Sequence, residues 1–83
     1  MIEAIEEPIE VLVRFDRGTM TPFRFRWNTT VFRIAAVTGR WEDREGQYRR
    51  CHYSVVTEAN DYFELRFHLQ DLCWMLSKAS IDA

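Results

Sequence analysis

Residues 22–27 decide the fold, and they read PFRFRW. Apolar and charged side chains alternate in this stretch, so Phe23, Phe25 and Trp27 point to one side of an extended chain. Arg24 and Arg26 lie between them and point to the other side. Strict alternation is typical of a β-strand with one buried face and one wet face. The stretch therefore predicts a strand whose outer face carries arginine.

The same alternation recurs along the chain and predicts an all-β fold. We expect six strands, at residues 9–15, 22–27, 31–41, 47–57, 62–68 and 72–77. Every connection is short, which favours antiparallel hairpins in a meander. A flat sheet of this size would expose its edges, so we expect a curled sheet or a small barrel. Residues 72–79 also fit a helical stripe, and we favour the strand there.

Alternation also assigns the core of what we expect to be a single domain. The 83 residues are enough for one β domain, with residues 1–7 as a flexible leader and residues 79–83 as a frayed tail. The side chains expected to be buried are Ile9, Val11, Val13, Phe15, Phe23, Phe25, Trp27, Phe32, Ile34, Ala36, Cys51, Tyr53, Val55, Phe63, Leu65, Phe67, Leu72, Trp74 and Leu76.

The register of the hairpin formed by residues 47–57 and 62–68 follows from matching buried side chains. With residues 59–61 as the loop, Tyr53 pairs with Phe67. The same register places His52 directly opposite His68 on the outer face. We therefore expect two solvent-facing histidines that repel each other when both are protonated.

A tight turn after residue 27 sets a second register. A loop at residues 28–29 pairs Phe25 with Phe32. It also sets Arg24 opposite Arg33, whereas a loop at residues 29–30 puts Arg26 there instead. Either register brings two arginines face to face on the wet side, which destabilises a sheet unless an acid or a ligand intervenes.

The third strand raises the question of where Trp41 points. A four-residue turn at residues 43–46 pairs Trp41 with Tyr48. Straight counting along the strand puts Trp41 on the outer face. Gly39 is a natural site for a β-bulge, however, and one extra residue there turns Trp41 into the core. We expect the bulge, because an exposed Trp is uncommon without a purpose.

The titratable residues do not form a recognisable catalytic or metal-binding motif. His52, His68 and Cys73 share the expected outer face with Glu64, but the compact ligand pairs of zinc modules are missing. Cys51 points inward, where a thiol is inert. No glycine-rich phosphate loop occurs in the sequence. We therefore expect no enzyme, no metal site, no cofactor and no small-molecule substrate.

The distribution of charge suggests two kinds of partner. The net charge is −2, but residues 22–57 hold seven arginines and only three acids, whereas residues 1–10 hold four acids and no base. Arginines with interleaved aromatics are typical of sheets that bind single-stranded nucleic acid. The residues that would do so are Arg24, Arg26, Arg33, Arg50 and Arg66, with Trp41 and Tyr48 as stacking platforms. Because the net charge is acidic, contact with a protein partner or with a second copy is the leading hypothesis, and nucleic acid is the alternative.

The composition indicates the cellular compartment in which we expect the protein to act. No apolar run is long enough to span a membrane, and the acidic start lacks the features of a signal peptide. Two cysteines that do not form a CxxC pair fit reduced thiols. We expect a cytoplasmic protein with no membrane partner.

Several segments together resemble a known group of proteins. They are residues 23–28, 31–37, 39–41, 62–67 and 74–76. The pattern resembles a group of short uncharacterised bacterial all-β proteins, a domain of unknown function. Some members are encoded near polymerases of the error-prone repair type, so the resemblance implies an accessory role in DNA metabolism. Thr29 stands where the group commonly has Gly, and His68 where it frequently has Asp.

Overall fold

The computed structural model describes residues 1–80 and consists of six antiparallel strands in the order of the sequence. The strands are β1 (Ile2–Asp16), β2 (Thr19–Trp27), β3 (Thr30–Glu45), β4 (Tyr48–Thr57), β5 (Tyr62–His68) and β6 (Cys73–Ser80). Each strand pairs with the next, and β1 also pairs with β6, so the strand order closes into a ring. The all-β antiparallel meander expected from alternation is confirmed.

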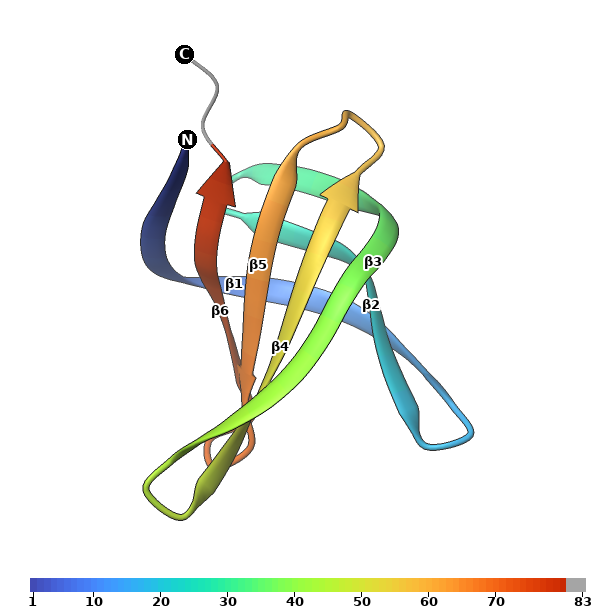
Figure 1. The fold of residues 1–83 in the computed structure, drawn as a ribbon. Helices are drawn as coiled ribbons and strands as arrows, with labels where there is room; N and C mark the ends of the chain where they lie inside the picture. The colour runs from blue at the N-terminus through green and yellow to red at the C-terminus, as the bar shows by residue number, and fades with distance from the viewer. Residues whose placement is uncertain (81–83) are drawn as a thin grey trace.

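Two long strands make the ring possible, because each bends between two parts of the sheet. In β1, residues 2–9 pair with β6 and residues 10–16 pair with β2. In β3, residues 30–33 pair with β2 and residues 34–45 pair with β4. Figure 1 shows β4, β5 and β6 side by side, with β1 crossing behind them and the β1–β2 and β3–β4 hairpins projecting from the body in different directions.

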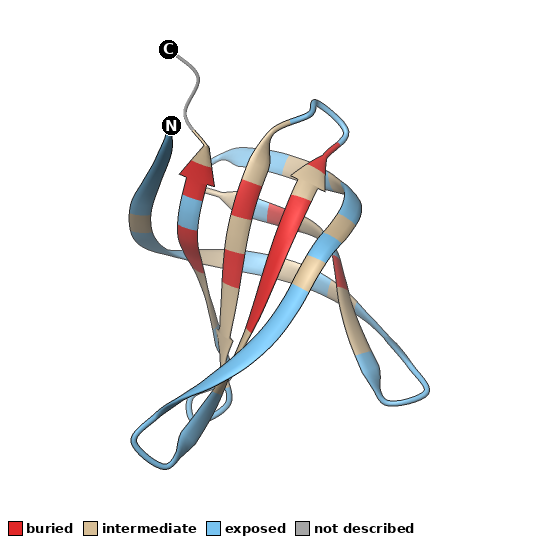
Figure 2. Cartoon of the chain, viewed as in Figure 1, coloured by how far each residue is buried: buried red, intermediate tan, exposed pale blue. Residues whose placement is uncertain are grey.

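The core lies between the bent strands and the β4–β5–β6 part of the sheet (Figure 2). Its buried side chains are Phe25, Tyr53, Val55, Phe63, Leu65, Leu76 and Ala79. Phe25 stacks on Phe32 with ring centroids 5.0 Å apart and meets Phe63 edge-on at 5.1 Å. Aromatic pairs at such distances add to the stabilisation that comes from burial alone. The segment that also fits a helical stripe is strand β6, which buries Leu76 and Ala79.

The expected flexible leader is wrong for the first residues, because they belong to β1. Residues 2–4 and 7–9 pair with β6, and Ile5 packs against the core. A bulge separates the two paired stretches, and Glu6 there has a φ of 54°. Ala79, expected in the frayed tail, is buried and pairs with Phe63, while residues 81–83 lie outside the described residues.

Four of the side chains expected in the core are exposed instead, and local irregularities explain most of them. Phe23 is the extra residue of a bulge, because Leu12 pairs with Arg24 and the next residue of β1 pairs with Pro22. Ala36 lies between two bulges of β3, and Leu72 lies in the turn before β6 with a φ of 56°. Phe15 is 71% exposed near the tip of the β1–β2 hairpin.

The β4–β5 hairpin has a register two residues away from the expected one. Tyr53 pairs with Leu65, and His52 lies opposite Arg66 rather than opposite His68. The loop is residues 58–60, with Asn60 at a φ of 70°. A three-residue hairpin loop favours a left-handed residue in its last position, and Asn tolerates that conformation well. The expected histidine pair is therefore wrong, although both histidines stay on the outer face.

Trp41 is on the outer face and 42% exposed, so the expected burial is wrong. A register shift does lie next to Gly39, but a second one lies between Ile34 and Ala36. Each bulge turns the following side chains to the opposite face, so two bulges cancel. The β3–β4 turn is also shorter than expected, since Glu45 pairs with Tyr48 across residues 46–47. Trp41 consequently pairs with His52 and not with Tyr48.

The β2–β3 hairpin confirms the first of the two expected registers. Phe25 pairs with Phe32, and Arg24 lies opposite Arg33. Asn28 has a φ of 56°, as the first residue of a tight two-residue loop requires. Among residues 1–80 there is no helix long and apolar enough to cross a membrane.

Candidate functional site

The seven residues expected to bind nucleic acid lie on two separate outer faces. Arg24, Arg26 and Arg33 lie on the β1–β2–β3 part of the sheet. The others lie on the outer side of the part formed by β3, β4 and β5, or at its end, and they are Trp41, Tyr48, Arg50 and Arg66. The structure therefore does not bring the seven residues together on one surface.

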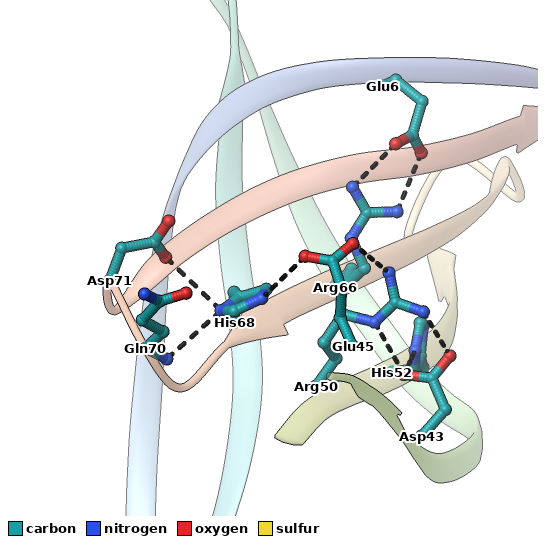
Figure 3. Close-up of polar contacts among 9 residues, drawn as sticks. All are labelled: Glu6, Asp43, Glu45, Arg50, His52, Arg66, His68, Gln70 and Asp71. Atoms are coloured by element: carbon teal, nitrogen blue, oxygen red, sulfur yellow. Dashed lines mark hydrogen bonds and ion pairs between the residues drawn. The ribbon is translucent and has the colours of Figure 1, made fainter. Parts of the chain in front are cut away.

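The β3–β4–β5 face carries what we call the ion-pair network, formed by Glu6, Asp43, Glu45, Arg50, His52, Arg66 and His68 (Figure 3). Arg50 donates from Nε and Nη2 to the two carboxylate oxygens of Asp43 at 2.8 and 2.7 Å. Such bidentate pairs are the strong form of the arginine–carboxylate contact. The hydrogen bonds from Arg50, followed by the contact with His52, hold the pKa of Asp43 far below its ordinary value.

Arg66 is engaged in the same way by an acid from a distant part of the chain. It donates to both carboxylate oxygens of Glu6 at 3.0 and 2.7 Å, linking β5 to β1 across β6. The hydrogen bond from Arg66 lowers the pKa of Glu6. The side chains of Arg50 and Arg66 are only 22% and 17% exposed, so little of either guanidinium is open to a phosphate.

The two histidines both belong to this network. His52 is nearly buried, contacts Asp43 at 2.9 Å and stacks on Trp41 with ring centroids 5.3 Å apart. His68 contacts Glu45 at 3.3 Å. Within residues 1–80, no group of three or more histidine, cysteine or acidic side chains is arranged to hold a metal ion.

The second outer face, which we call the Leu12–Val31 face, is organised as two rows across three strands. One row is Leu12, Arg24 and Arg33, and the other is Glu10, Arg26 and Val31. Residues directly opposite in an antiparallel ladder project from the same face, so each row is continuous. Leu12 and Val31 are 52% and 54% exposed, and they line a shallow hollow of about 210 Å³ together with Arg24.

The arginines of the Leu12–Val31 face differ in their partners. Arg26 contacts Glu10 at 2.6 Å, which neutralises it. Among residues 1–80, no carboxylate lies within ion-pair distance of Arg24 or Arg33. The Nε–H of Arg24 is also buried without a hydrogen-bond acceptor in the described part of the chain. An unmatched buried donor is unfavourable. The row of Leu12, Arg24 and Arg33 is therefore the part of the surface where a partner could supply missing acidic and acceptor groups.

The thiols offer no comparable site. Cys51 and Cys73 are free, and burial raises the pKa of the Cys51 thiol. A thiol with a raised pKa is a poor nucleophile at neutral pH. Cys51 lines a hollow of about 340 Å³ between the two projecting hairpins, with Arg40 and Tyr53.

Sequence reasoning missed the acids that engage the arginines. Asp43 and Glu45 were expected in a turn, and Glu6 in a flexible leader. The available signal for the first two acids was Gly46. A Gly in the first position of a two-residue loop extends both strands and sets Asp43 opposite Arg50, and Gly46 has a φ of 61° in the structure. Nothing local in the sequence points to the contact between Glu6 and Arg66.

Comparison with known proteins adds no relative: no protein-family model, no curated protein and no solved structure matches this chain.

Proposed function

We propose that this chain is a non-enzymatic cytoplasmic β-domain that acts by contact with another protein through the Leu12–Val31 face. The observation that carries the proposal is the combination of two half-exposed aliphatic side chains with two arginines that lack an acidic partner among residues 1–80. Exposed apolar groups rimmed by polar ones are characteristic of protein-contact sites. The free and exposed thiol of Cys73 is in keeping with a reducing compartment.

Charge favours a different protein over a second copy at this face. A two-fold contact of the face with itself would bring Arg24 and Arg33 of two chains together, and like charges at an interface are unfavourable. A partner with carboxylates beside apolar side chains would supply both missing contacts. It would pair with the two arginines and cover Leu12 and Val31.

Nucleic-acid binding, with an accessory role in DNA metabolism, is the weaker proposal. Arg50, Arg66 and Arg26 already pair with acids, and the aromatic side chains suggested for base stacking lie on the other face. A labelled single strand at low salt tests this reading directly, since phosphate contacts give strongly salt-dependent binding. We expect no binding by the unaltered chain that disappears in a variant in which Arg24 and Arg33 are both replaced. Binding that did disappear in that variant would support the nucleic-acid proposal.

Site-specific cross-linking tests the proposed protein contact. A photoreactive amino acid is incorporated in place of Val31 in the full chain. This variant is expressed in the organism that encodes the protein, so that natural partners are present. The matched control carries the same group at Lys78, an exposed residue of β6 on the opposite part of the sheet. We expect a discrete cross-linked protein from position 31 that disappears when Arg24 and Arg33 are both replaced by Glu. Equal cross-linking from both positions, or none from position 31, would contradict the proposal.

A further inference from the structure

The part of β3 that pairs with β4 has a free backbone edge on its other side. Residues 34–45 pair with β4 on one side, whereas β2 pairs only with residues 30–33. The end of the projecting β3–β4 hairpin diverges from the β1–β2 hairpin, as Figure 1 shows, and a hollow of about 340 Å³ separates the two at Arg40, where the Arg40 side chain reaches Thr21 of β2. Residues 40–45 are all exposed, and no turn or loop backbone hydrogen bond within residues 1–80 engages them. A regular, exposed strand edge is a template for another strand.

The bulges of β3 leave only one part of this edge regular. The register shifts lie between Ile34 and Gly39, and pairing with β4 is regular from Gly39 to Glu45. Bulges discourage strand addition where they occur, so an added strand would pair with residues 39–45. Trp41 lies in this part, half-exposed on the outer face, with Arg40 and Glu42 flanking it on the inner face.

We propose that a second copy of the chain adds to this edge, with the two β3 strands antiparallel and centred on Trp41. In this register Trp41 lies beside Trp41 of the second copy. Arg40 of each copy lies opposite Glu42 of the other, so the interface contains two such pairs. The interface is isologous, because the same strand serves on both sides. The outer faces of both copies lie on the same side, so the β3–β4–β5 part of each sheet continues into the other.

The charges of β3 select this register over its neighbours. Moving the centre to residue 42 sets Glu42 against itself, and moving it to residue 40 sets Arg40 against itself. Like charges directly opposite destabilise an antiparallel pair, whereas opposite charges and aromatic pairs stabilise it. With the centre at Trp41, Asp43 meets Gly39 and Arg44 meets Thr38, so no like charges face each other.

The intrachain contacts of the two flanking residues do not compete strongly with this arrangement. Arg40 donates to Thr21 Oγ1 at 3.1 Å and lies over the ring of Tyr53. Glu42 forms a single contact of 3.3 Å with Arg49, and both side chains are more than half exposed. Exposed ion pairs contribute little in water, so Glu42 is available to a second chain.

Charge reversal with rescue tests the dimer by sedimentation equilibrium. Arg40→Glu and Glu42→Arg each put like charges opposite one another at both symmetric positions, and we expect each to weaken dimerisation about tenfold or more. An equimolar mixture of the two variants restores opposite charges and should dimerise again, as should the double variant R40E/E42R. Glu58→Arg, in the exposed β4–β5 loop, is the control and should dimerise like the unaltered chain.

Three results would overturn the inference: an unaltered chain that is monomeric at high concentration, single variants that dimerise as well as it does, or a mixture that stays monomeric. Far-ultraviolet circular dichroism establishes that each variant is folded. The inference is independent of the proposed function, because Arg40 and Glu42 lie outside the Leu12–Val31 face. Cross-linking from position 31 should therefore survive both single substitutions.

Discussion

Adding one methyl group at Gly39 should destabilise the fold through a single contact with Ser54. A Cβ at position 39 would lie 2.7 Å from Ser54 Oγ, closer than real Cβ atoms come to any neighbour. Ser54 is buried, and its hydroxyl is held by Thr38 Oγ1 at 2.9 Å. Rotating Ser54 away would break that hydrogen bond. Overpacking of this kind costs about 1–3 kcal/mol, so we expect Gly39→Ala to lose that much stability.

The test is a double-mutant cycle measured by urea unfolding. The next atoms near the added Cβ are at 3.7 and 3.9 Å, so Ser54→Ala removes the clash. Ser54→Ala alone should cost about 1 kcal/mol for the lost hydrogen bond. Adding Gly39→Ala in that background should then be neutral or stabilising, because Ala loses less backbone entropy than Gly.

A second glycine provides the matched control. Gly46 has a φ of 61° and open space around its Cα, so Gly46→Ala acts through backbone strain alone. Its cost of about 1–2 kcal/mol should be the same with Ser54 and with Ala at position 54. If Gly39→Ala also cost the same in both backgrounds, the contact with Ser54 would not be its cause.

Three further predictions concern the ion-pair network and the β4–β5 loop. The lowered pKa values of Asp43 and Glu6 mean that their contribution to stability is present above the ordinary carboxyl range of about 4 and is lost as pH falls through the folded-state values. Asp43→Asn should therefore flatten the dependence of stability on pH in urea titrations from about pH 5 down to about pH 2. Glu6→Gln should speed amide hydrogen exchange in residues 2–4, which pair with β6, and leave residues 11–13 unchanged. Asn60→Ala should cost about 1–2 kcal/mol in thermal unfolding because of the left-handed φ, whereas Asn60→Gly should not.

The alternation of apolar and polar side chains predicted the strands well, because this alternation has a single physical cause. A small sheet must bury one face, and a period of two is the only spacing that keeps Tyr53, Val55, Phe63 and Leu65 on it. The errors in the core are concentrated where the period is broken. Phe23 and Ala36 both lie at or between bulges, and a bulge arises from the bending of the whole sheet. No local pattern in the sequence records that bending.

Loop length decided which registers were predicted correctly. The loop at Asn28 is the shortest that two strands allow, so matching Phe25 with Phe32 left little choice. The loop at Asn60 admits two alignments that differ by two residues and bury the same faces. Only the conformation of Asn60 separates them, since the observed loop puts it in the left-handed position. That distinction moved His52 from His68 to Arg66.

Loop length also determines whether an arginine is free to bind a partner, which is why counting arginines did not locate the site. The outward direction of Arg50 follows from alternation and was predicted correctly. Its availability depends on the residue opposite it: the expected four-residue turn sets Arg50 opposite Gly39, whereas the two-residue turn at residues 46–47 sets it opposite Asp43. The first arrangement leaves a free cation for a phosphate, and the second neutralises it with a bidentate pair. Arg24 and Arg33 remain unmatched within residues 1–80 because the tight turn between them pairs arginine with arginine, and this is the reason for placing the partner at the Leu12–Val31 face.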